Sequence, residues 1–134
     1  MMSDFWKAAT CVFLNSFSMD TSIRLVSEKI TLADLKEIAI NGFGDMVKAV
    51  VDIEKGVMAI GAEMHADAEA WLLERGSEQA NLWGINIYPD ALEPERVEFD
   101  SMINIRPRQG NRSRGVEDES KRKKILAIVR RLVS

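Results

Sequence analysis

The sequence is poor in the residues that most often reveal a protein's chemistry. Its 134 residues include one cysteine, one histidine and three prolines. A single cysteine excludes an internal disulfide, which fits a reducing compartment. No apolar run approaches the roughly 20 residues needed to cross a bilayer, so we expect a cytoplasmic protein without membrane contact. No phosphate-binding P-loop, dinucleotide fingerprint or G-x-S-x-G serine motif is present, which argues against the enzyme classes built on them.

What remains is the composition of an ordinary soluble domain with an uneven charge. Apolar residues make up 46% and charged residues 29% of the chain. The net charge is −3, but the last 30 residues carry seven arginines and three lysines against three acids, a net +7, which leaves −10 for the rest. Such asymmetry is typical of an anion-binding end or of a basic helix face in water.

The length of the chain indicates one domain, preceded by an extension. Residues 1–22 are interpreted as an N-terminal extension, expected to be poorly ordered, and residues 23–134 as a single α+β domain. The short apolar patch from Ala8 to Leu14 lacks a clear positively charged n-region and a good small-residue cleavage site, which argues against a signal peptide.

Hydrophobic periodicity predicts eight elements in the order β-α-β-β-α-β-β-α. Thr31 is the expected N-cap of the first helix, and Lys55-Gly56 the expected two-residue turn of a hairpin. The strands are predicted at 23–27, 47–54, 57–64, 82–88 and 96–106, and the helices at 31–41, 65–75 and 117–133. Mixed order with a hairpin predicts a mostly antiparallel sheet of four to five strands with helices packed on one face.

Several long stretches resemble a known family. The stretches FGDMVKAVVDIEKG, EMHADAE, LWGINIYP and EFDSMINIRPRQGNRSRG resemble a small prokaryotic family of unknown function, catalogued as domain of unknown function 5674. The resemblance spans about residues 23–133. It implies no activity, ligand or catalytic residue, and it makes residues 1–22 an addition to the family domain.

Three residues form a candidate catalytic or metal site. Glu63 and His65 meet at a predicted strand-to-helix junction, and Asp100 lies on a predicted neighbouring strand. Histidine and carboxylates are good ligands for zinc, manganese or iron. The spacing matches no metal signature, and the alternative is that His65 stabilises the turn.

The predicted strand at 96–106 presents charge on one side only. Alternation places Phe99, Ser101 and Ile103 toward the core. It places Glu98, Asp100, Asn104 and Arg106 on an open face, which we expect to be shared with Lys48, Asp52, Glu63 and Asn86. The alternative is a solvated face held by cross-strand pairs.

The loop that follows is rich in arginine. Its guanidinium groups match phosphate or carboxylate, and it leads to a helix N-terminus, which attracts anions. The predicted ligand-binding residues here are Arg106, Arg108, Asn111, Arg112 and Arg114, together with Glu98 and Asn104 from the strand. The alternative is that the arginines pair internally with Glu98, Asp100 and the acids of the last helix.

The sequence therefore favours a small binding domain that holds an anionic, phosphate-bearing ligand or a nucleic-acid backbone through the arginine loop and the polar sheet face. The alternative is a metal-dependent hydrolase or nuclease using Glu63, His65 and Asp100. No cofactor and no oligomeric state follow from the residues.

Overall fold

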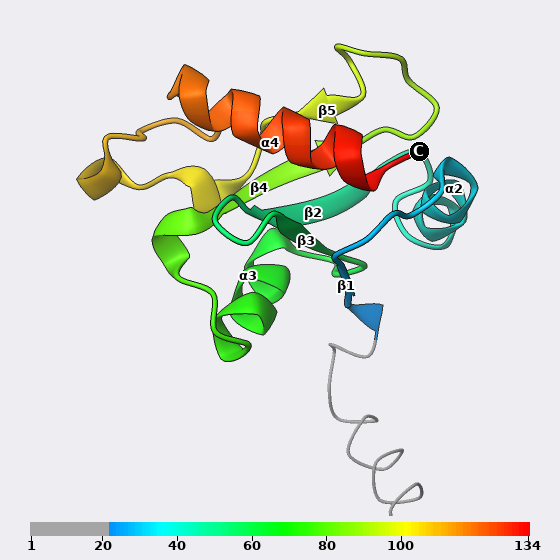
Figure 1. Ribbon diagram of the computed structural model, residues 1–134, viewed down its shortest axis with the longest axis horizontal. Helices are drawn as coiled ribbons and strands as arrows, with labels where there is room; N and C mark the ends of the chain where they lie inside the picture. Colours follow the sequence, from blue (N-terminus) through cyan, green and yellow to red (C-terminus); the bar gives the residue numbers. More distant parts are fainter. Residues whose placement is uncertain (1–21) are drawn as a thin grey trace, which may run out of the picture.

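A computed structural model describes residues 22–134, so residues 1–21 of the predicted extension, Cys11 among them, lie outside the described residues. The strands are β1 (Arg24–Val26), β2 (Val47–Asp52), β3 (Val57–Ile60), β4 (Leu82–Ile87) and β5 (Val97–Glu98). The helices are α2 (Leu32–Asn41), α3 (His65–Glu74) and α4 (Glu119–Leu132). The strands form one antiparallel sheet in the order β1-β3-β2-β4-β5 (Figure 1). The α+β class and the predicted element order are confirmed. No helix within the described range is long and apolar enough to span a membrane.

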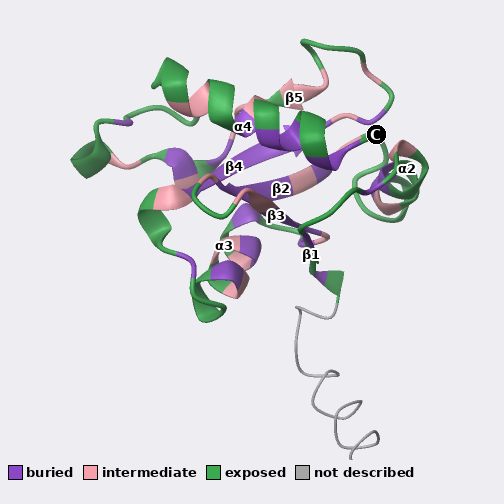
Figure 2. Cartoon of the chain, viewed as in Figure 1, coloured by how far each residue is buried: buried purple, intermediate pink, exposed green. Residues whose placement is uncertain are grey.

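The helices cover both faces of the sheet, so the prediction that they pack on one face is wrong. On one face, α2 and α4 pack against residues such as Ala49, Val51 and Ile85. On the other, α3 packs against Val50 and Leu82. Figure 2 shows the central strands β2 and β4 largely buried. The apolar residues that both strands direct to each face explain why a helix is needed on either side.

The hairpin of β2 and β3 turns through four residues, 53–56, because its register pairs Asp52 with Val57. The two-residue turn predicted at Lys55-Gly56 is wrong. One oxygen of the Asp52 carboxylate accepts the backbone N–H groups of Glu54 and Lys55, both at 2.9 Å, and the other accepts the hydroxyl of Ser77 at 2.7 Å. This side-chain cap fixes the longer turn. The register moves by two residues, so the paired residues up to Ile60 keep their predicted faces, whereas Ala62 and Glu63, beyond the end of β3, do not.

The strand predicted at 96–106 is wrong beyond Glu98. The chain continues into two short 3-10 helices, Met102–Asn104 and Pro107–Gln109. Alternation is lost with the strand, because Phe99 packs on the core that α4 covers and Ile103 on the core that α3 covers. Asn104 and Arg106 therefore do not share the face of Glu98.

Side chains replace the missing strand along the free edge of β4. The Asn104 amide accepts the N–H of Gly84 at 2.8 Å and donates to its carbonyl at 3.0 Å, as a strand peptide would. The Arg106 guanidinium donates to the carbonyl of Leu82. A sheet edge has unpaired N–H and C=O groups, and these two side chains satisfy them.

The arginine loop is held by its own polar residues. The buried Asn111 amide donates to the carbonyls of Asn104 at 2.7 Å and Gly115 at 2.8 Å, and its oxygen accepts the N–H of Glu117 at 2.8 Å. Hydrogen bonds from the backbone N–H groups of Arg112 and Ser113 lower the pKa of Glu117. The loop therefore has a defined shape without any ligand.

Candidate functional site

The described residues form a polar hollow of about 430 Å³ on the α3 face of the sheet, beside the start of that helix. This size is within the range of small-molecule sites. Its polar lining is Lys48, His65, Asn86, Tyr88, Glu98, Asp100, Ser101 and Arg114. Its apolar walls include Met46, Met64, Met102 and Ile103.

Strand register brings the floor of the polar hollow together. Lys48 lies opposite Asn86 in the β2–β4 pair, and Asn86 lies opposite Glu98 in the β4–β5 pair. The three side chains form one row across the sheet, just beyond the part that α3 covers. Gly84, the next residue on this face of β4, admits Ser101 and His65, because a Cβ there would lie 2.6 Å from the Ser101 hydroxyl.

Asn86 is the least satisfied residue of the floor. Its amide nitrogen donates to Glu98 Oε1 at 2.8 Å and to the carbonyl of Asp100 at 3.3 Å. Its Oδ1 is buried and accepts no hydrogen bond from the described residues, although the residue is only 5% exposed. A buried acceptor without a donor lowers the free energy of unfolding by about 1–3 kcal/mol. A hydrogen-bond donor at this position would therefore be stabilising.

His65 is held in one tautomer. Its Nε2 lies 2.8 Å from the carbonyl of Ile85, which can only accept, so Nε2 carries the proton and Nδ1 the lone pair. Burial lowers the pKa of His65, an effect that the bond to Ile85 partly opposes. The imidazole is therefore neutral at pH 7.

The pKa of His65 predicts a pH dependence of stability. The pKa is lower in the folded protein than its ordinary value of 6.5, so the unfolded chain binds the proton more readily. The contribution of His65 to the free energy of unfolding is then fully present above about pH 6.5, and it is lost as the pH drops through and below that value. Urea unfolding between pH 5 and 8 measures it. We expect His65→Gln to flatten this dependence, and an equal slope in the variant would show that other groups cause it.

The first turn of α3, which lies beside the polar hollow, has unpaired amides. Met64 is the N-cap and provides no side-chain hydrogen bond, and the N–H groups of His65 and Ala66 have no acceptor among residues 22–134. Both residues line the hollow. A helix N-terminus carries about half a positive charge, so this end of the hollow favours an anion.

The charged side chains give the polar hollow two poles. Arg114 Nε pairs with Asp100 Oδ1 at 2.6 Å, so these two charges largely offset each other. Lys48 lies over the ring of Phe43, 4.7 Å from its centroid, and adds a positive charge near the start of α3. Glu98 accepts from Asn86 and from the hydroxyl of Tyr88 at 3.1 Å and forms no ion pair with a described residue.

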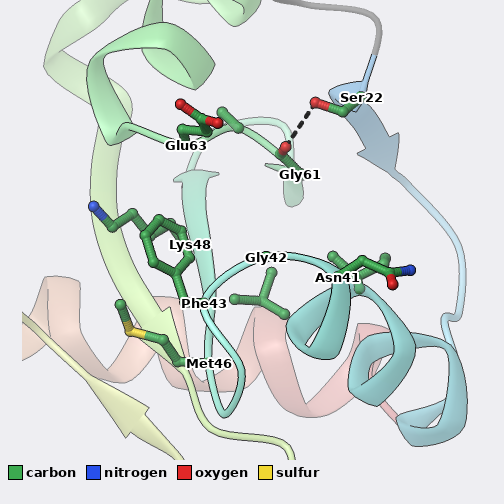
Figure 3. Close-up of a pocket in the computed structure, with 11 residues that line it drawn as sticks. Ser22, Asn41, Gly42, Phe43, Met46, Lys48, Gly61 and Glu63 are labelled. Atoms are coloured by element: carbon green, nitrogen blue, oxygen red, sulfur yellow. Dashed lines mark hydrogen bonds between the residues drawn. The ribbon is translucent and has the colours of Figure 1, made fainter.

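Glu63 lies apart from the other candidate catalytic residues. It lines a neighbouring hollow of about 380 Å³, between the end of α2 and the loop after β3 (Figure 3). In Figure 3, the Ser22 hydroxyl donates to the carbonyl of Gly61, at the point where the chain leaves β3. His65 and Asp100 line the polar hollow without it. Within residues 22–134, no three His, Cys, Asp or Glu side chains are grouped to hold a metal ion.

Of the predicted ligand-binding residues, Arg114 and Glu98 line the polar hollow. Arg106 is directed beneath the sheet edge, where it donates to the carbonyls of Ile103 and Gln79 and faces Glu69 at 3.5 Å. Asn104 and Asn111 are buried in the loop, and Arg108 and Arg112 are exposed outside the hollow. The pairing of Arg114 with Asp100 matches the internal alternative.

Sequence reasoning missed two parts of this site. The methionine walls carry no recognisable pattern, because Met46, Met64 and Met102 come from three different connections. The unpaired start of α3 did leave a signal, since no Ser, Thr, Asp or Asn stands at the cap position before His65.

Comparison with known proteins gives one match. A family model described as Protein of unknown function (DUF5674) matches residues 24–132. No curated protein and no solved structure matches the chain.

Proposed function

Since the chain belongs to the family DUF5674, whose description gives no activity, we propose from its own side chains that it is a binding domain whose polar hollow holds a small phosphate-bearing ligand. The observation that supports this most directly is the uncapped start of α3, where His65 and Ala66, whose N–H groups have no acceptor among residues 22–134, line the hollow. The buried, unpartnered Oδ1 of Asn86 is an independent support for a ligand at the floor.

Two sources of positive charge support the anion position. The first amides of α3 carry a partial positive charge, and Lys48 lines the same hollow. Arg114 also lines the hollow, but Asp100 offsets its charge, and Arg106 is satisfied internally. A hollow of this size fits a metabolite better than a polymer, which favours a small ligand over a nucleic-acid backbone. A cytoplasmic location belongs to the same proposal.

The test is a titration of ¹⁵N-labelled protein with inorganic phosphate, adenosine monophosphate and a short single-stranded RNA. We expect the small phosphates to shift the amide resonances of His65 and Ala66. We expect Lys48→Met to weaken that binding about tenfold, the effect of losing one charge-assisted contact. Lys124→Met, on α4 across the sheet, is the matched control and should leave the Kd unchanged.

Two results would contradict the proposal. The first is the absence of shifts at His65 and Ala66 at millimolar concentrations of every phosphate compound. The second is RNA binding with a steep salt dependence that maps to Arg108 and Arg112, which would place the phosphate contacts on the outer loop.

A further inference from the structure

The proposed anion would occupy only one end of the polar hollow. The other end is lined by two hydrogen-bond acceptors. Asn86 Oδ1 has no donor, and Glu98 Oε2 receives no hydrogen bond from residues 22–134. Glu98 Oε1 already accepts two, from the amide of Asn86 at 2.8 Å and the hydroxyl of Tyr88 at 3.1 Å. These bonds hold the carboxylate in place beside the unpartnered amide oxygen. A deprotonated anionic oxygen cannot satisfy either of these oxygens, because both are acceptors and it has no hydrogen to donate.

The charges agree with this division. Asp100 is paired with Arg114, whereas Glu98 forms no ion pair with a described residue. Lys48 and Glu98 stand on strands separated by β4, and neighbouring strands lie about 4.8 Å apart, so the two poles are on the order of 10 Å apart at the backbone. The space between them suits a short ligand with opposite charges at its two ends.

We propose that the ligand of this site is a small amino-bearing anion, whose ammonium group binds between Asn86 Oδ1 and Glu98 and whose anionic group binds at the start of α3. The inference rests on the proposed function and adds the second half of the ligand. An ammonium group provides three donors and a positive charge, and so satisfies both oxygens at once. A hydroxyl would satisfy Asn86 but leave the charge of Glu98 unpaired. Aminoalkyl phosphates and small amino acids share this chemistry.

The test compares ligands that differ only in the ammonium group. O-phosphoethanolamine and ethyl phosphate are titrated into the labelled full chain, and the side-chain amide of Asn86 and the backbone amides of His65 and Ala66 are followed. We expect phosphoethanolamine to bind at least tenfold more tightly than ethyl phosphate and to be the only one of the two that shifts the Asn86 side-chain resonances. This comparison uses the unaltered protein and depends on no variant.

Glu98→Gln keeps the size and the acceptor oxygen but removes the charge. We expect it to abolish the preference for phosphoethanolamine while ethyl phosphate binds at least as tightly as to the unaltered protein, because a negative charge near the anion is removed. Glu74→Gln, an exposed carboxylate at the far end of α3, is the matched control and should preserve the preference. Thermal unfolding of both variants checks that they are folded.

The outcomes separate this inference from the proposed function. Equal Kd values for the two phosphates, or an unchanged preference in Glu98→Gln, overturn the ammonium site and leave phosphate binding intact. If neither phosphate binds but β-alanine does, with loss in Glu98→Gln, the ammonium site stands and the phosphate proposal fails. If none of the three compounds binds, both fail.

Discussion

Replacing Asn104 with alanine is expected to lower the free energy of unfolding by about 3–5 kcal/mol, because the change leaves the N–H and C=O groups of Gly84 unpaired, whereas the carbonyl of Arg114 keeps the N–H of Ser101. The Asn104 side chain is fully buried and makes three hydrogen bonds, with the N–H of Gly84, the carbonyl of Gly84 and the carbonyl of Arg114. Each orphaned group costs about 1–3 kcal/mol, and a domain of this size has about 5–15 kcal/mol in total. Urea unfolding monitored by tryptophan fluorescence measures the loss.

Two further variants test whether the amide itself is responsible. Asn104→Asp keeps one acceptor for Gly84 N–H but directs the second oxygen at two carbonyls, so we expect a loss as large as that of alanine. Asn41→Ala, at the exposed end of α2, should change stability by no more than about 0.5 kcal/mol. A loss below about 1 kcal/mol in Asn104→Ala would mean that water or a relaxed loop pairs the edge of β4 instead.

The role of Asn104 shows where a period-two pattern stops being informative. In β2 and β3 the pattern alternates apolar side chains toward opposite cores, and the predicted faces of Ala49 and Met58 survive a two-residue error in register. After Glu98 the same alternation continues in the sequence but not in the backbone. A polar residue at every second position can face water, or its side chain can form hydrogen bonds with the unpaired backbone groups of a neighbouring strand edge. The spacing in the sequence is the same in both cases.

The candidate site was predictable in part for the same reason. Lys48, Asn86 and Glu98 lie in regular strands, so alternation and strand neighbourhood place them together, as the register confirms. Glu63 was expected to join them. Instead, β3 ends at Ile60 and Gly61 has a φ of +97°, so the chain changes direction before Glu63 is reached. A backbone reversal at glycine is compatible with the sequence but is not dictated by it.

The second large effect is expected at Arg106, for which we predict a structural role. Its side chain is 9% exposed, faces the Glu69 carboxylate at 3.5 Å and lies over the ring of Trp83, 4.5 Å from its centroid. Its donors reach the carbonyls of Ile103, Gln79 and Leu82. Arg106→Ala leaves a largely buried carboxylate without its counter-charge, so we expect a loss of about 3–5 kcal/mol in urea unfolding. Arg106→Lys should recover little, because one ammonium group cannot replace a planar fork that reaches several acceptors.

A double-mutant cycle with Glu69→Gln identifies the cause of that loss. Glu69 Oε2 is buried and is charge-paired with Arg106 without an aligned hydrogen bond, so neutralising it alone removes attraction but also a desolvation cost. We therefore expect Glu69→Gln to be mild and to relieve part of the loss in Arg106→Ala, with a coupling of about 0.5–3 kcal/mol. Arg108→Ala, two residues along and exposed, is the control. The structural role would be contradicted if Arg106→Ala left the free energy of unfolding unchanged but abolished phosphate binding. That result would mean that the guanidinium does not pair with the edge of β4 and binds the ligand instead.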